Sequence, residues 1–196
     1  FENIKHIDQS LILWRSSTQW IGGLYFLFSI IYLIDIYDES LKKSLTNFIS
    51  FSSSEIFKQA VKIFILYSGL TLIIFIILNI FSIRSFDSLN LAFSLISSGG
   101  FLPVNDLSSI IKENYQIIML SFLMLLSFFS IFFTYNLLSL KNRNINFFYE
   151  DLHLIVYFII VISIFFLFFS FNSDFSKNLL SVSSSMSNIG FAFNTK

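Results

Sequence analysis

The sequence predicts an all-α integral membrane protein built from repeated units, each a spanning helix, a short half-helix and a second spanning helix. First, several apolar runs approach the roughly 20 residues that a helix needs to cross a bilayer, in a chain that is 55% hydrophobic with a mean hydropathy of +0.77. Second, two shorter stretches each end in a glycine loop, about 90 residues apart in the chain. Similarity at a fixed spacing indicates an internal repeat.

Composition excludes several function classes. Only 12% of the residues are charged and the formal net charge is zero, so nothing favours nucleic acid as a partner. The chain has no cysteine, which rules out disulfides, thiolate zinc sites and thiol nucleophiles within it. No Ser/His/Asp grouping, phosphate-binding glycine loop or carboxylate pair indicates an enzyme. Because the sequence starts at Phe1 without a signal-peptide pattern, we expect a piece of a longer protein.

The first spanning helix is predicted over residues 11–37, with Trp14 and Trp20 as an aromatic belt at its start and Tyr32 and Tyr37 at its end. Gly22 and Gly23 within it are expected to be packing notches between helices.

Three further spans follow, separated by polar connections. The second is predicted over residues 56–83, where Gly69 and Thr71 make a small polar spot for close helix packing. The third and fourth are predicted over residues 115–140 and 152–171.

Residues 85–103 are too short and too polar to cross a bilayer, although spans flank them. Ser85 is a possible helix N-cap and Asp87 lies in the first turn, so a half-helix is expected over residues 86–97. It breaks at the glycine run that ends in Gly100. At membrane depth, non-helical backbone persists only inside protein or beside a watery cavity.

The C-terminal stretch has the same organisation. Asp174 precedes a half-helix expected over residues 176–186, and a break follows at Gly190. We therefore divide the chain into the closing helix and loop of a first repeat, a complete second repeat and the opening part of a third, over residues 1–55, 56–146 and 147–196.

Both half-helices end at glycine loops, and this arrangement favours cation binding. A helix C-terminus carries partial negative charge, and freed carbonyls replace the water of an ion. The competing interpretation is that both loops are surface turns after interfacial helices; two such elements at one repeat distance make it the weaker one.

Three motifs resemble the potassium transporters of the Trk/Ktr/HKT superfamily. Residues 14–23, WRSSTQWIGG, resemble the run that follows the first pore loop of that family; residues 97–101, SSGGF, and 188–191, NIGF, resemble its second and third pore loops. The resemblance implies four repeats in a potassium-channel-like fold around one cation path, with Gly100 and Gly190 as filter glycines. The implied potassium site comprises Ser98, Gly99, Gly100, Phe101, Asn188, Ile189, Gly190 and Phe191.

The same resemblance implies potassium uptake across the cytoplasmic (inner) membrane by a multi-pass protein. Potassium is then the substrate, no cofactor is expected, and the partners are lipid, a second copy of the protein in a homodimer and a cytosolic nucleotide-binding regulatory subunit. The first filter loop and everything after the third are missing from this sequence. The alternative is a membrane-embedded scaffold or enzyme whose half-helices are interfacial and whose glycines are structural.

Three sets of charged or titratable residues allow a second interpretation. Arg15 lines the mouth of the path or, as we favour, anchors the helix at the membrane interface. Glu150, Asp151 and His153 resemble part of a metal site, but a solvated helix start explains them better, because no third converging ligand is evident. His6 beside Asp8 is treated in the same way.

Overall fold

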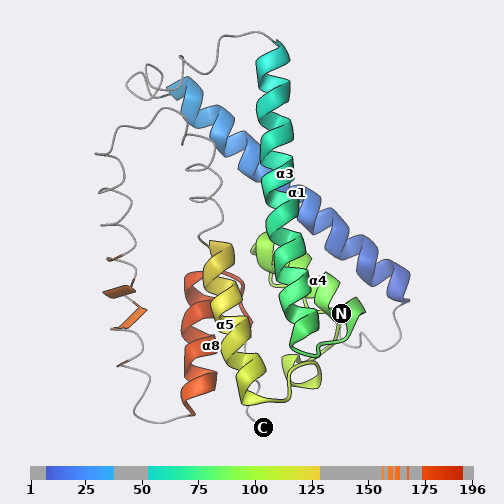
Figure 1. Ribbon diagram of the computed structural model, residues 1–196, viewed down its shortest axis with the longest axis vertical. Helices are drawn as coiled ribbons and strands as arrows, with labels where there is room; N and C mark the ends of the chain where they lie inside the picture. Colours follow the sequence, from blue (N-terminus) through green and yellow to red (C-terminus); the bar gives the residue numbers. More distant parts are fainter. Residues whose placement is uncertain are drawn as a thin grey trace.

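The computed structural model describes residues 8–37, 53–128 and 174–191, together with the single residues 156, 159, 160, 162, 163 and 167. Every regular element in these ranges is a helix, so the all-α prediction is confirmed for the described part of the chain (Figure 1). The main elements are α1 (Gln9–Tyr37), α3 (Ser53–Ile80), α4 (Ser85–Ile96), the 3₁₀ turn η2 (Leu107–Ser109), α5 (Asn114–Phe128) and α8 (Phe175–Met186).

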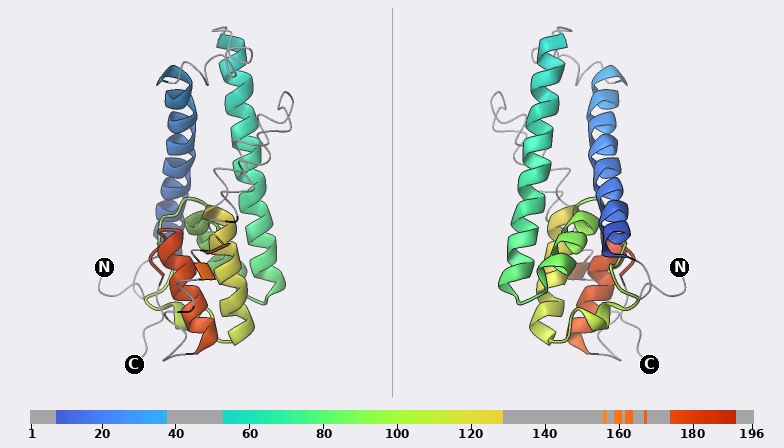
Figure 2. Two further views of the ribbon diagram at one scale, coloured as in Figure 1. Left: turned by 90° about the vertical axis from the view of Figure 1, so that its left-hand side faces the viewer. Right: turned by 90° about the vertical axis from the view of Figure 1, so that its right-hand side faces the viewer.

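Two long helices dominate the outline. α1 has 29 residues and α3 has 28, which corresponds to roughly 40 Å each at 1.5 Å per residue. They run in opposite directions and cross, and both extend beyond the cluster formed by α4, α5 and α8 (Figures 1 and 2). Their lengths agree with the first two predicted spans.

One stretch in the described ranges, Ala60–Ile80 of α3, is both long and apolar enough to cross a membrane, with a mean hydropathy of 2.5. Its large apolar side chains divide between a buried set and an exposed set. Ile74 and Leu78 are fully buried, whereas Leu72 and Ile76 are exposed by 57% and 45%. The helix thus leaves an apolar face exposed.

The remaining two predicted spans are described only in part. α5 starts at Asn114, one residue before the predicted start of the third span, and its described part ends at Phe128. The fourth span lies outside the described residues except for six single positions, as do residues 141–155.

The first half-helix is confirmed as α4, a helix of 12 residues. At about 18 Å it is too short to span a bilayer. Asp87 lies in its first turn as predicted, but the N-cap position is Arg84 rather than Ser85. The Ser85 hydroxyl instead donates a hydrogen bond to the Asn79 side-chain oxygen at 2.9 Å, which ties the start of α4 to the end of α3.

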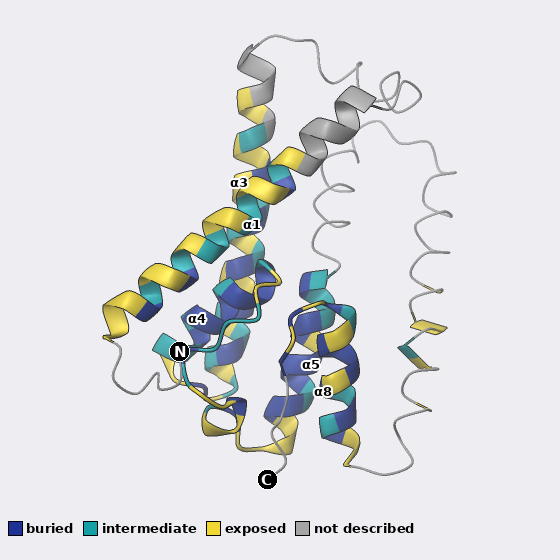
Figure 3. Ribbon diagram, turned by 180° about the vertical axis from the view of Figure 1, so that it is seen from behind, coloured by how far each residue is buried: buried dark blue, intermediate teal, exposed yellow. Residues whose placement is uncertain are grey.

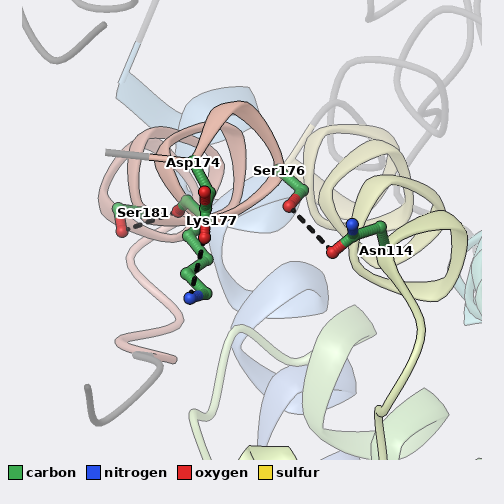
Figure 4. Close-up of polar contacts among 5 residues, drawn as sticks. All are labelled: Asn114, Asp174, Ser176, Lys177 and Ser181. Carbon is green, nitrogen blue, oxygen red and sulfur yellow. Dashed lines mark hydrogen bonds and ion pairs between the residues drawn. The ribbon is translucent and has the colours of Figure 1, made fainter. Parts of the chain in front are cut away.

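The second half-helix is α8, also of 12 residues, and it packs along α5. Near its start, the Ser176 hydroxyl donates to the Asn114 side-chain oxygen at 3.3 Å (Figure 4). Asp174 pairs with Lys177 at 3.0 Å on the exposed side. Such an exposed pair contributes little to stability.

The core surrounds α4. Leu91, Ala92 and Leu95 have no solvent exposure, and α4 contacts α1, α3 and α5. Figure 3 shows the buried residues concentrated in α4, α5 and α8, while much of α1 faces outward. A short helix enclosed in this way holds its C-terminal end, and the loop after it, at a defined place.

Candidate functional site

The loops that follow α4 and α8 have the same backbone shape. Ser98 and Gly100 adopt positive φ angles of 50° and 66°, and Asn188 and Gly190 adopt 55° and 77°. Each pair follows a helix of equal length and lies 90 positions from the other. The sequence repeat therefore extends to backbone geometry within the described residues.

Both loops also cap their helices with the same hydrogen bonds. The amides of Gly99 and Ile189 each donate to the carbonyl five residues earlier, at 2.9 and 3.2 Å. The hydroxyls of Ser97 and Ser187 each donate to the carbonyl four residues earlier, at 2.7 Å. This is the Schellman arrangement, in which a residue in the left-handed conformation ends the helix and turns the chain away from it.

The two loops meet through their backbones. A Cβ atom at Gly100 would overlap the carbonyl oxygen of Ile189, so the backbone of the second loop occupies the place of a side chain in the first. Gly100 is thus required both for its positive φ and for this approach. Gly190 differs, because no atom lies within 4 Å of the equivalent Cβ position and only its φ of 77° favours glycine.

The eight predicted site residues divide into exposed and anchoring positions. Five of them are exposed or partly exposed, namely Ser98, Gly99, Gly100, Asn188 and Gly190. Ile189 and Phe191 are buried at 3% exposure each, and Phe101 is half-buried. The structure thus brings together the residues that the two motifs predicted, with apolar anchors beside open backbone.

Phe101 holds the end of the first loop. Its amide donates to the hydroxyl of the buried Ser94 at 2.8 Å, which ties the loop back to α4. The guanidinium of Arg15 lies 4.2 Å from the centre of its ring, a cation–π contact. Of the two interpretations of Arg15, this geometry favours the one that places it beside the loop.

The motif on α1 packs against α4, α3 and the first loop. The Ser16 hydroxyl donates to the buried Asn90 side-chain oxygen at 2.6 Å. A Cβ at Gly23 would come within 2.8 Å of the Ser97 Cβ, and one at Gly99 would overlap the side chain of Gln19. α1 and α4 therefore lie in register and run in the same direction.

Trp20 is part of this packing and does not belong to an exposed aromatic belt. Its indole N–H donates to the Thr71 hydroxyl at 3.0 Å, and its ring lies 5.2 Å from that of Tyr67 and 5.7 Å from that of Phe93. Trp14, in contrast, is 68% exposed and is free to serve as an interfacial residue.

Gly22 and Gly23 on α1 were both predicted to allow close helix packing, and so were Gly69 and Thr71 on α3. In each pair only one residue makes such a contact. Gly23 is a close-approach position, as predicted, but a side chain at Gly22 or Gly69 would meet nothing within 4 Å. The packing role assigned to Gly22 and Gly69 is therefore wrong within the described structure, whereas Thr71 does pack, because it accepts the Trp20 hydrogen bond.

Sequence reasoning missed Ser16, Gln19 and Asn90 as contact residues. The available signal was the spacing of Ser16, Trp20, Gly23 and Leu27 along one helical face. That face is the one that α1 turns toward its neighbours.

The titratable groups of the described residues do not indicate a catalytic or metal-binding site. Burial raises the pKa of the Asp87 carboxyl, and the nearby Arg84 partly opposes this shift. Within the described residues no three His, Cys, Asp or Glu side chains come together as a metal-ion cluster. Glu150, Asp151, His153 and His6 lie outside the described part.

Comparison with known proteins adds no relative: no family model matches the chain, and neither the curated proteins nor the solved structures contain a match.

Proposed function

We propose that the chain is part of a potassium transporter of the Trk/Ktr/HKT type, in which the loops at Ser98–Phe101 and Asn188–Phe191 form two walls of a cation filter. The observation that carries the proposal is the meeting of two loops of equal backbone shape, 90 residues apart, with the Ile189 carbonyl oxygen against Gly100. Backbone oxygens at the ends of enclosed short helices are the groups that replace the hydration shell of an alkali cation.

The chemistry of the loops supports a hard, monovalent cation. Carbonyl oxygens and helix C-termini attract positive charge, and no cluster of charged side chains in the described residues would hold a divalent ion. Potassium in particular rests on the resemblance of the three motifs. Under the proposal, residues 1–55 close a first repeat, 56–146 form the second and 147–196 open the third, and the remaining filter loops lie outside this sequence.

The proposal also implies where the protein is located and which partners it has. It is a multi-pass protein of the cytoplasmic membrane, with lipid against the exposed side of α3. A homodimer and a cytosolic nucleotide-binding regulatory subunit follow from the resemblance, and so does the absence of catalysis or a resident cofactor.

A flux assay tests the filter directly. The complete gene would be expressed in a cell that lacks potassium uptake, as wild type and as Gly100→Ser, Gly190→Ser and Gly22→Ser. We expect the first two variants to lose potassium over sodium selectivity, because a side chain disturbs a left-handed glycine and, at Gly100, displaces a carbonyl. Gly22→Ser is the matched control, since its side chain would enter open space.

The alternative, a membrane-embedded scaffold or enzyme with structural half-helices, makes the opposite prediction. If Gly100→Ser and Gly190→Ser both carry potassium at the wild-type rate and selectivity, the loops are not the filter. The scaffold would then be the better explanation of the glycine loops.

A further inference from the structure

The two loops share a backbone shape but differ at their central residue. This residue is Gly99 in the first loop and Ile189 in the second. The Ile189 side chain is buried and belongs to the apolar core. In the second loop, therefore, the side chain of the loop itself fills the space beneath the backbone.

In the first loop that space is filled from another helix. A Cβ at Gly99 would overlap three atoms of the Gln19 side chain, including its amide nitrogen. Gln19 belongs to α1, 80 residues earlier in the sequence. Its carboxamide thus lies where the side chain of residue 99 would point.

Gln19 supports the loop at Gly99 by its volume and not by a hydrogen bond from its side-chain oxygen. The Gln19 side-chain oxygen is buried and has no hydrogen-bond partner among the described residues. A buried acceptor without a donor costs free energy and holds nothing in place by hydrogen bonding. The bulk of the side chain is what supports the loop.

We propose that Gln19 is a positioning residue for the first loop, which sets the direction of the carbonyls from Ser98 to Gly100 by filling the space beneath Gly99. This deepens the proposed function, on which it rests. Gln19 touches no ion; it acts through the loop, and it makes the first wall of the path dependent on the preceding repeat.

The test uses the complete protein and reads selectivity as the potassium to sodium flux ratio. Gln19→Ala leaves the loop unsupported and lowers the ratio by about tenfold, because small displacements of positioned groups have large effects. Gln19→Met keeps the bulk and loses no hydrogen bond from the side-chain oxygen, so the ratio stays within about twofold of wild type. Gln19→Met that loses as much selectivity as Gln19→Ala would overturn the proposal.

A double-mutant cycle tests the packing without relying on transport. Gly99→Ala places its methyl group where the end of the flexible Gln19 side chain lies, so Gln19 must move, and the unfolding midpoint of the purified protein falls by roughly 1–3 °C. In Gly99→Ala combined with Gln19→Ala the new methyl group has room, and the midpoint rises again. Additive effects in this cycle would show that the two residues do not share the space, and the inference would fail.

The two measurements separate the two proposals. If the wild-type protein carries no alkali cation, the proposed function fails while the cycle can still show coupling. If the wild type is selective and the cycle is additive, the filter stands and the role of Gln19 is wrong.

Discussion

Two residues other than glycine adopt the left-handed conformation at the ends of α4 and α8, Ser98 with φ of 50° and Asn188 with φ of 55°. For an ordinary L residue this conformation costs roughly 1–2 kcal/mol, and asparagine tolerates it better than serine. Backbone strain of this kind tends to collect at functional sites. The strain lies in the first residue of each loop.

Replacing Ser98 with glycine removes that strain. We expect Ser98→Gly to raise the free energy of unfolding by about 0.5–1 kcal/mol, measured by thermal unfolding of the purified protein. Ser97→Gly is the control, because Ser97 has φ of −88° and its hydroxyl caps the Phe93 carbonyl. That variant should be destabilised, and a gain in both would contradict the assignment of strain to Ser98.

The hydrogen bond between Trp20 and Thr71 gives a second expectation at single residues. Thr71→Val leaves the indole N–H without its acceptor and should cost about 1–2 kcal/mol. Thr71→Ser keeps the hydroxyl and should cost less than half as much. A larger loss in Thr71→Ser than in Thr71→Val would mean that the methyl group of Thr71, and not its hydroxyl, carries the contact.

At the level of elements, α4 is held to α1 by a polar contact at Asn90, whereas the equivalent position of α8 carries an apolar core residue. Asn90, fully buried, accepts from Ser16, and 90 positions later stands the fully buried Leu180. The same position of the two half-helices is thus buried as a polar residue in one and as an apolar residue in the other.

This contrast predicts a paired result. Ser16→Ala alone leaves the Asn90 oxygen without its donor and should destabilise the protein by roughly 1–3 kcal/mol. Ser16→Ala combined with Asn90→Leu replaces both partners by apolar groups and should come within about 1 kcal/mol of wild type. Chemical or thermal unfolding of the purified variants measures both, and a double variant worse than the single one would contradict the argument.

The bounds of the half-helices could be predicted from sequence to within one or two residues. Asp87 and Asp174 mark the starts, and the serine and glycine runs mark the ends, because these residue types act locally. The docking of α1 could not be predicted in the same way. The contact between Ser16 and Asn90 joins residues 74 positions apart, and nothing local in either segment encodes it.

The two loops of the candidate site could be predicted from the sequence, but the contact between them could not. The repeat spacing identified Gly100 and Gly190 as equivalent. The residue whose carbonyl faces Gly100 is Ile189 and not Gly190. This depends on how α4 and α8 are placed relative to each other in the tertiary structure, which the local sequence does not specify. The filling of the first loop by Gln19 depends on the same arrangement.

For the whole molecule, the half-helix organisation predicts that the segments on either side of each glycine loop emerge on one face of the membrane. Cysteine at Ser108, after the first loop, and at Asp174, before α8, should both react with an impermeant thiol reagent from outside. Cysteine at Lys141 should react only from the cytoplasmic side. Because the chain has no native cysteine, the labelling background is zero within it. Opposite accessibility of Ser108→Cys and Asp174→Cys would rule out the repeat arrangement.

The glycines of this chain limit which residues the two loops and their surroundings accept. The chain has 28 Phe but only six Gly. Four of these six are Gly23, Gly99, Gly100 and Gly190, which the structure places against occupied space or at positive φ. A chain this poor in glycine thus has most of its glycines in the two loops or against them, where an added side chain would meet an occupied position or a left-handed backbone.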